Sequence, residues 1–133
     1  MRAERRCFSA MVEHCRVEHP HEACGLLAGK DKLITKVYTM TNTSENPETC
    51  YFMDPQEQLK AFKEMRNSGL EMLGIYHSHG ASSAYPSPRD VEMAFYPEAI
   101  CVIVSLTDPQ KPEVGSFRIV EGKIEKEELI LSG

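Results

Sequence analysis

The sequence predicts a single mixed α/β domain, residues 1–133, in which helices flank a central, mostly antiparallel sheet. Segments with apolar residues at helical spacing alternate with short apolar runs of strand length. Proline follows a capping residue at two predicted helix starts. The chain contains no internal repeat and no long linker, and its 133 residues suit one ordinary domain. We expect the order helix, hairpin, helix, strand, helix and then strands.

The first part of the chain predicts a helix followed by a β-hairpin. Residues 3–18 carry one apolar stripe at helical spacing, and Pro20 closes the segment. The stripe consists of Phe8, Met11, Val12 and Cys15. Residues 23–28 and 33–40 are expected to be strands, with a turn at 29–32 between them.

A second helix is predicted directly after a short strand at residues 50–53. Asp54 offers a capping carboxylate, Pro55 suits the first helical position, and Glu57 stands three residues after the cap. The apolar side of this helix is expected to consist of Leu59, Phe62 and Met65. Gly69 is a suitable residue for the end of the helix.

The second half of the chain holds four further apolar runs of strand length: 72–76, 100–106, 114–120 and 124–131. The run at 100–106 is β-branched and continuous, which predicts a buried central strand. The last two runs flank Glu121 and Gly122 and predict a terminal hairpin. Between the first two runs, Ser87 as a cap and Pro88 at the first helical position predict a third helix.

Composition narrows the classes of function. The formal net charge of -5 disfavours nucleic acid as a partner. No apolar run approaches the ~20 residues of a membrane helix, and the first ten residues lack the apolar core of a signal peptide. The five cysteines form no CxxC pair, which favours reduced thiols in a cytoplasmic protein.

The strongest chemical feature is the pair His77 and His79 with Asp90 eleven residues later. Alternate residues of a strand point to the same face, so both imidazoles would converge on one point. Two histidines and one carboxylate are the usual protein ligands of a catalytic zinc ion. Ser87 would place a hydroxyl beside this site, although a serine three residues before an acid also simply caps a helix. The remaining histidines have polar neighbours and are expected to face solvent: His14, His19 and His21.

The full spacing, His-x-His, seven residues, Ser, two residues, Asp, resembles the signature of the JAMM family of zinc isopeptidases, also called MPN-plus. Four segments extend the resemblance: 21–29, 52–55, 74–79 and 85–87. The similarity covers most of the span from Phe8 to Leu106. It implies the MPN/JAMM fold, which is similar to that of cytidine deaminases, and a short single-domain member of the prokaryotic type.

The resemblance also implies roles for individual residues. His77, His79 and Asp90 match the family's Zn²⁺ ligands. Ser87 matches the serine that holds the attacking water and helps to stabilise the tetrahedral intermediate. Glu22 matches the general base, whereas on its own it would be interpreted as a solvated carboxylate at a strand edge.

Two positions and two segments need the structure for their interpretation. Gly80 stands where many relatives have proline, and this could loosen the loop that follows. Cys24 is either a buried small hydrophobe or a neighbour of the site, because it shares a strand face with Glu22. Residues 41–53 and 80–86 are the predicted walls of a substrate groove.

The resemblance implies hydrolysis of the amide bond after the C-terminal Gly-Gly of a ubiquitin-like protein, here a sulfur carrier. The alternative is a non-catalytic module that binds ubiquitin-like proteins, or a scaffold subunit. A zinc deaminase built on His21 and Glu22 lacks the PCxxC segment that supplies its cysteine ligands, and no nucleophile elbow indicates a serine hydrolase. A homodimer remains open at this point.

Overall fold

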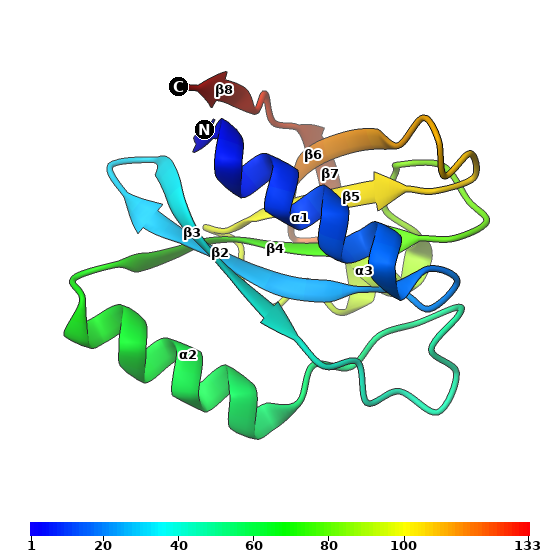
Figure 1. Ribbon diagram of the computed structural model, residues 1–133, viewed down its shortest axis with the longest axis horizontal. Coiled ribbons are helices and arrows are strands. Elements are labelled where there is room, and N and C mark those ends of the chain that lie inside the picture. Colours follow the sequence, from blue (N-terminus) through cyan, green and yellow to red (C-terminus); the bar gives the residue numbers. More distant parts are fainter.

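The computed structural model describes all residues 1–133 and shows a curled eight-stranded sheet with helices on both faces (Figure 1). Its elements are β1 (Arg2–Glu4), α1 (Arg5–Glu18), β2 (Cys24–Lys30), β3 (Leu33–Met40), α2 (Pro55–Asn67), β4 (Glu71–His79), α3 (Pro88–Glu92), β5 (Ile100–Ser105), β6 (Glu113–Val120), β7 (Lys123–Lys126) and β8 (Ile130–Ser132). The strand order is β7-β6-β5-β4-β2-β3-β1-β8. Antiparallel pairings are in the majority, and the predicted fold class is confirmed.

The end of the chain joins the two edges of the sheet. Strands β7 and β8 stand at opposite ends of the strand order, although only residues 127–129 separate them. The backbone N–H of Glu127 donates to Ser116 on β6, and that of Ile130 donates to Met1. The sheet must therefore curl until its edges approach each other. The prediction of one continuous final strand at 124–131 was wrong. The segment forms two strands: β7, which pairs with β6 in the expected hairpin, and β8, which pairs with β1.

Helix α1 packs on one face of the sheet through the predicted stripe. Met11 and Cys15 are buried there, and Phe8 and Val12 pack at the margin. Strand β5 contributes alternate residues to this core, Ile100, Val102 and Val104, because strand side chains alternate between faces. The helix begins later than predicted, since residues 2–4 pair with β3 and β8 as strand β1.

Helix α2 covers part of the opposite face (Figure 1). Its start is as predicted: the Asp54 side chain accepts a hydrogen bond from the backbone N–H of Gln56, 2.9 Å away. Its apolar side is displaced from the prediction, because Ala61 and Met65 are buried while Leu59 is 57% exposed. Gly69 follows the helix with a φ of 69°, which is a left-handed conformation that glycine adopts without strain.

Two neighbouring inner strands, β4 and β5, run parallel, and β4 carries the histidines of the functional site. Strand β4 continues through His79, so both histidines of the motif lie within the sheet. A parallel pair needs a crossover, and residues 80–99 supply it with α3 included. The predicted strand at 50–53 is reduced to one bridge between Asn42 and Met53. None of the three helices has the length and apolar character needed to cross a membrane.

Candidate metal centre

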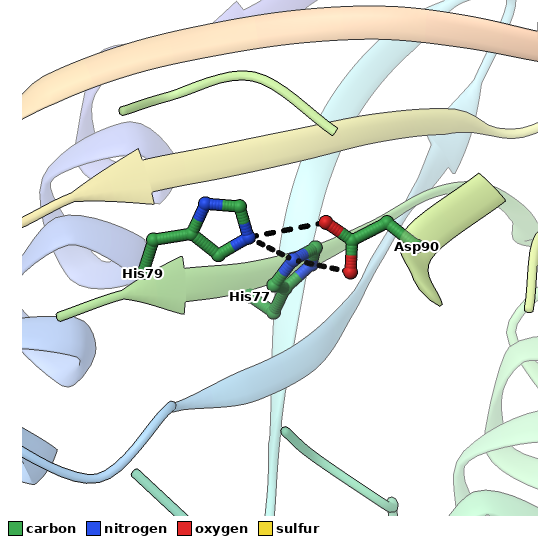
Figure 2. Close-up of side chains that lie close together, drawn as sticks. All are labelled: His77, His79 and Asp90. Atoms are coloured by element: carbon green, nitrogen blue, oxygen red, sulfur yellow. Dashed lines mark hydrogen bonds and ion pairs between the residues drawn. The ribbon is translucent and has the colours of Figure 1, made fainter. Parts of the chain in front are cut away.

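His77, His79 and Asp90 converge at the end of β4 (Figure 2). The two imidazoles share one face because they are alternate residues of a strand. Their relative exposures are 1% and 5%, so both lie in the protein interior. Helix α3 brings Asp90 over them from the crossover. The predicted grouping of these three residues is therefore present in the fold.

The distances between the donor atoms suit a bound cation. Nε2 of His77 lies 3.1 Å from Nε2 of His79, and the Asp90 carboxylate oxygens lie 3.2 and 3.1 Å from these two nitrogens. An ion with tetrahedral ligands at about 2.0–2.2 Å would separate the donor atoms by about 3.3 Å. Two nitrogen lone pairs and a carboxylate repel one another at such distances unless they share positive charge. The three side chains could therefore hold a metal ion.

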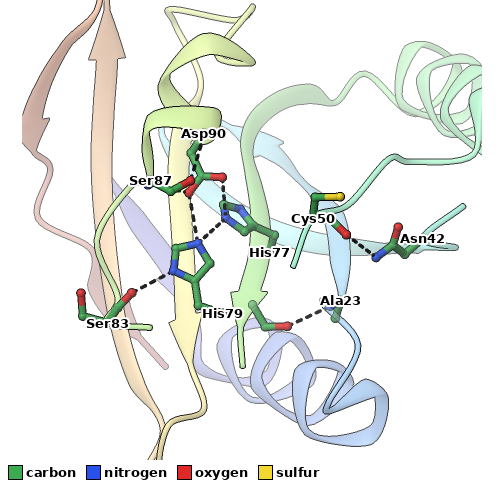
Figure 3. Close-up of polar contacts among 9 residues, drawn as sticks. Ala23, Asn42, Cys50, His77, His79, Ser83, Ser87 and Asp90 are labelled. Carbon is green, nitrogen blue, oxygen red and sulfur yellow. Dashed lines mark hydrogen bonds and ion pairs between the residues drawn. The ribbon is translucent and has the colours of Figure 1, made fainter. Parts of the chain in front are cut away.

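Contacts behind the imidazoles fix their orientation (Figure 3). Nδ1 of His79 lies 2.8 Å from the backbone carbonyl of Ser83. A carbonyl can only accept, so Nδ1 carries the proton and Nε2 of the neutral ring presents its lone pair. The ring of Tyr51 stacks on that of His77 with centroids 4.7 Å apart. Nδ1 of His77 is buried without a hydrogen-bond partner. No pattern in the sequence points to Tyr51 or Ser83.

Ser87 and Asp90 form a capping box at the start of α3. The Ser87 backbone N–H donates to Asp90 Oδ2 over 2.9 Å, and the Asp90 N–H donates to Ser87 Oγ over 3.1 Å. The capping interpretation of this pair is thus confirmed. Capping also orients the carboxylate toward the histidines. The Ser87 hydroxyl acts here as acceptor, so its own proton remains free for another partner.

The electrostatics of the three residues favour an anionic carboxylate beside imidazoles. Burial would raise the pKa of Asp90, but hydrogen bonds with His77 and His79 hold that pKa far below its ordinary value. Burial lowers the pKa of His77. Burial also acts to lower the pKa of His79, but its hydrogen bonds with Asp90 and Ser83 raise it overall.

Glu22 lies beside this centre and is buried. Its exposure is 7%, so its interpretation as a solvated carboxylate is wrong. Burial raises its pKa to about 7, although nearby His79 acts to lower it. The residue also lines a polar cleft of about 350 Å³ together with side chains of α1 and the end of β3. A carboxylate with a pKa near neutrality can both take and release a proton at working pH.

Two other expectations are decided by the fold. Cys24 is completely buried opposite His77, in the core beneath α2, and burial raises its pKa to about 12, so it acts as a small hydrophobe. The expectation that His14 faces solvent without a partner is wrong, because its Nδ1 lies 2.6 Å from the Tyr76 hydroxyl. His21 is exposed as expected, whereas His19 is only partly exposed and its Nδ1 is buried.

An apolar groove of about 150 Å³ lies beside Tyr51. It is lined by Tyr51, Phe52, Met53, Gln58, Ile75, Arg89, Met93, Phe95 and Tyr96. One predicted wall, residues 41–53, thus contributes only its last three residues. Helix α3 and the residues that follow it complete the lining of this groove, and the loop 80–86 does not contribute to it. The loop 80–86 as a wall of the substrate groove therefore stays a prediction.

Comparison with known proteins identifies the family. The sequence model of a protein family, described as prokaryotic homologs of the JAB domain, matches residues 4–120, which is most of the chain. The chain belongs to the prokaryotic JAB family. This JAB-family chain is 44% identical over 121 residues to the CysO-cysteine peptidase of Mycobacterium tuberculosis, covering 90% of the chain and 82% of that protein. It is 42% identical over 81 residues to a probable TtuB-protein conjugate cleaving protease of Thermus thermophilus, covering 61% of the chain and 54% of that protein.

Solved structures agree with this assignment. The solution structure of a Desulfitobacterium hafniense protein is 40% identical, with a TM-score of 0.88 over 98% of this chain and 92% of that one. A JAB1/MPN domain protein from Archaeoglobus fulgidus has the same fold, with a TM-score of 0.70 at 20% identity and complete coverage of both chains. The JAMM resemblance is thus confirmed. With named peptidases among its relatives, this JAB-family chain is a hydrolase, which sets aside a purely non-catalytic role.

Proposed function

We propose that this chain is a zinc-dependent peptidase that hydrolyses the amide bond after the C-terminal Gly-Gly of a ubiquitin-like sulfur carrier. The observation that carries the proposal is the convergence of His77, His79 and Asp90, whose donor atoms lie 3.1 to 3.2 Å apart. The substrate class is supported by the names of two relatives, a CysO-cysteine peptidase and a TtuB-conjugate cleaving protease.

Zinc is the metal that the donor set favours. Two imidazole nitrogens and one carboxylate are the usual protein share of a catalytic zinc site, in which one position stays open. Bound there, the ion would act as a Lewis acid toward the carbonyl and lower the pKa of water to ~7. The orientation of His79 by Ser83 agrees with this role, because metal-binding histidines commonly donate their second ring N–H.

Glu22 is proposed to move the proton. In its ionised form it removes a proton from the attacking water, and in its protonated form it delivers that proton to the departing amine. In the metal-free chain, burial raises its pKa to about 7, so it binds a proton more readily than an ordinary carboxylate. Ser87 is proposed to donate a hydrogen bond to the developing oxyanion. Its Oγ already accepts from the Asp90 N–H, which leaves the hydroxyl hydrogen free for this bond.

The apolar groove between Tyr51 and α3 is proposed to hold the tail of the carrier. Tyr51 lines this groove and its ring stacks on that of His77, so a tail bound in the groove would lie next to the metal centre. A Gly-Gly terminus suits such an approach, because it lacks side chains that would collide with the buried ligands.

The proposal is tested by intact-mass spectrometry of a CysO–cysteine conjugate mixed with the zinc-loaded chain. We expect the conjugate to lose the mass of its terminal cysteine and to end at Gly-Gly. Glu22→Gln is the matched control, since it preserves shape and ligands but cannot act as a base. We expect its rate to fall by about 10²- to 10⁴-fold.

Two results would count against the proposal. An intact conjugate after prolonged incubation with zinc-loaded wild type would exclude this substrate class. Equal rates for wild type and Glu22→Gln would exclude Glu22 as the base, even if cleavage itself occurred.

A further inference from the structure

Asn42 lies near the start of the loop between β3 and α2, and its side chain makes four hydrogen bonds. Its Nδ2 donates to the backbone carbonyls of Glu22 and Cys50, at 2.9 and 3.1 Å. Its Oδ1 accepts from the backbone N–H groups of Ser44 and Phe52, at 3.0 and 3.1 Å. Carbonyls only accept and N–H groups only donate, so the orientation of the amide is unambiguous.

Asn42 binds the backbone carbonyl of Glu22, and another residue of the same loop binds the backbone N–H of Glu22. The Glu22 N–H donates to the carbonyl of Pro47 over 2.6 Å. Both main-chain groups of Glu22 are therefore held by residues 42–47, one of them through a side chain. The Glu22 carboxylate makes no hydrogen bond within the chain, so its position depends on how its backbone is anchored.

Within the same loop, Tyr51 contacts the metal centre. The Asn42 side chain donates to the Cys50 carbonyl (Figure 3). The next residue is Tyr51, whose ring stacks on that of His77. The Asn42 side chain thus connects the backbone of Glu22 to the segment whose Tyr51 ring covers His77. Asn42 is partly buried, which strengthens its hydrogen bonds relative to those of a solvated amide.

We propose that Asn42 is a positioning residue that holds Glu22 at the distance from the attacking water that proton transfer requires. This inference rests on the proposed function, in which Glu22 is the general base. A base must lie within about 2.6–3.2 Å of the proton that it takes. A displacement of about 1 Å at such a group can reduce a rate by about 10²-fold.

Asn42→Asp is the most informative variant. It keeps an oxygen to accept from Ser44 and Phe52 but replaces the donor to Glu22 and Cys50 with an oxygen that repels their carbonyls. Asn42→Ala is a second variant, which removes the donor without adding charge. Thr43→Val is the matched control: it removes a hydrogen bond to the Phe52 carbonyl in the same loop and does not touch Glu22.

The variants are compared by steady-state hydrolysis of the CysO–cysteine conjugate, zinc content and thermal unfolding. For Asn42→Asp and Asn42→Ala we expect kcat to fall by about 10²-fold with KM within about threefold and one zinc per chain. Thr43→Val should keep kcat within about twofold of wild type. If both Asn42 variants keep kcat within about threefold of Thr43→Val, the proposal is overturned.

A double variant separates positioning from general structural damage. If Asn42 acts through Glu22, adding Asn42→Asp to Glu22→Gln should leave the residual rate within about threefold. A further fall of about 10²-fold would mean that Asn42 supports the fold and not the base. Wild-type activity in Glu22→Gln alone would instead refute the proposed role of Glu22 as the base, and an uncleaved conjugate with wild type would refute the proposed function, so the failures are distinguishable.

Discussion

Replacing Glu22 with glutamine in the metal-free protein should stabilise the fold, and by more as the pH rises. Burial raises the pKa of Glu22 from an ordinary 4.5 to about 7. The difference of about 2.5 corresponds to roughly 3 kcal/mol, the free energy needed to keep this carboxylate ionised in the folded state. Glutamine has the same shape and no charge, so it avoids this cost.

The sign follows from the two protonation equilibria. Below pH 4.5 the carboxyl is protonated in both folded and unfolded chains, and the variant gains nothing. Between pH 4.5 and about 7 the unfolded chain releases its proton while the folded chain keeps it, so wild type loses stability across this window. Above pH 7 the variant should be more stable by about 3 kcal/mol at most.

Urea unfolding of both proteins with a chelator, at pH 4.5, 6 and 8.5, measures this difference. Glu45→Gln is the control, because Glu45 is exposed and its replacement should leave the free energy of unfolding unchanged. Added Zn²⁺ should reduce the gap, since a nearby cation favours the ionised carboxylate. A gap between wild type and Glu22→Gln that is equal at all three pH values would refute the reasoning.

Three further changes have definite expected outcomes. Asp90→Ala should lose zinc by elemental analysis, and full zinc occupancy would show that the ligand set is wrong. Tyr76→Phe removes the hydroxyl next to His14 and should cost ~1 kcal/mol in urea unfolding, whereas unchanged stability would mean that the pair contributes nothing. Gly29→Ala would press its Cβ into the Leu33 carbonyl, so we expect more than about 3 kcal/mol of destabilisation or no folded protein by circular dichroism.

Local sequence signals predicted much of the fold. The start of α2 follows from Asp54 and Pro55, because capping depends on neighbours only a few residues away. Strand 33–40 was predicted to the residue, since its apolar residues follow a turn. The grouping of the three candidate ligands was also predictable, because His77 and His79 share a strand face and Asp90 lies on a helix whose start carries its own signature.

The remainder depends on contacts between distant segments. The residues before Glu22 are polar and do not predict its burial, and the loop that binds its backbone lies at least 20 positions further along the chain. Strand β8 pairs with β1 at the far edge of the sheet, a contact across almost the entire chain. Tyr51 covers His77 although the two residues are 26 positions apart in sequence. No periodicity encodes such pairings, so they require the folded structure.

The metal centre is tested most directly by crystallography of the zinc-loaded protein, with anomalous data collected at the zinc edge. We expect one strong anomalous peak at about 2.0–2.2 Å from Nε2 of His77, Nε2 of His79 and a carboxylate oxygen of Asp90. Crystals grown with excess zinc that show no peak between these three side chains, or show the metal bound elsewhere, would contradict the proposed centre.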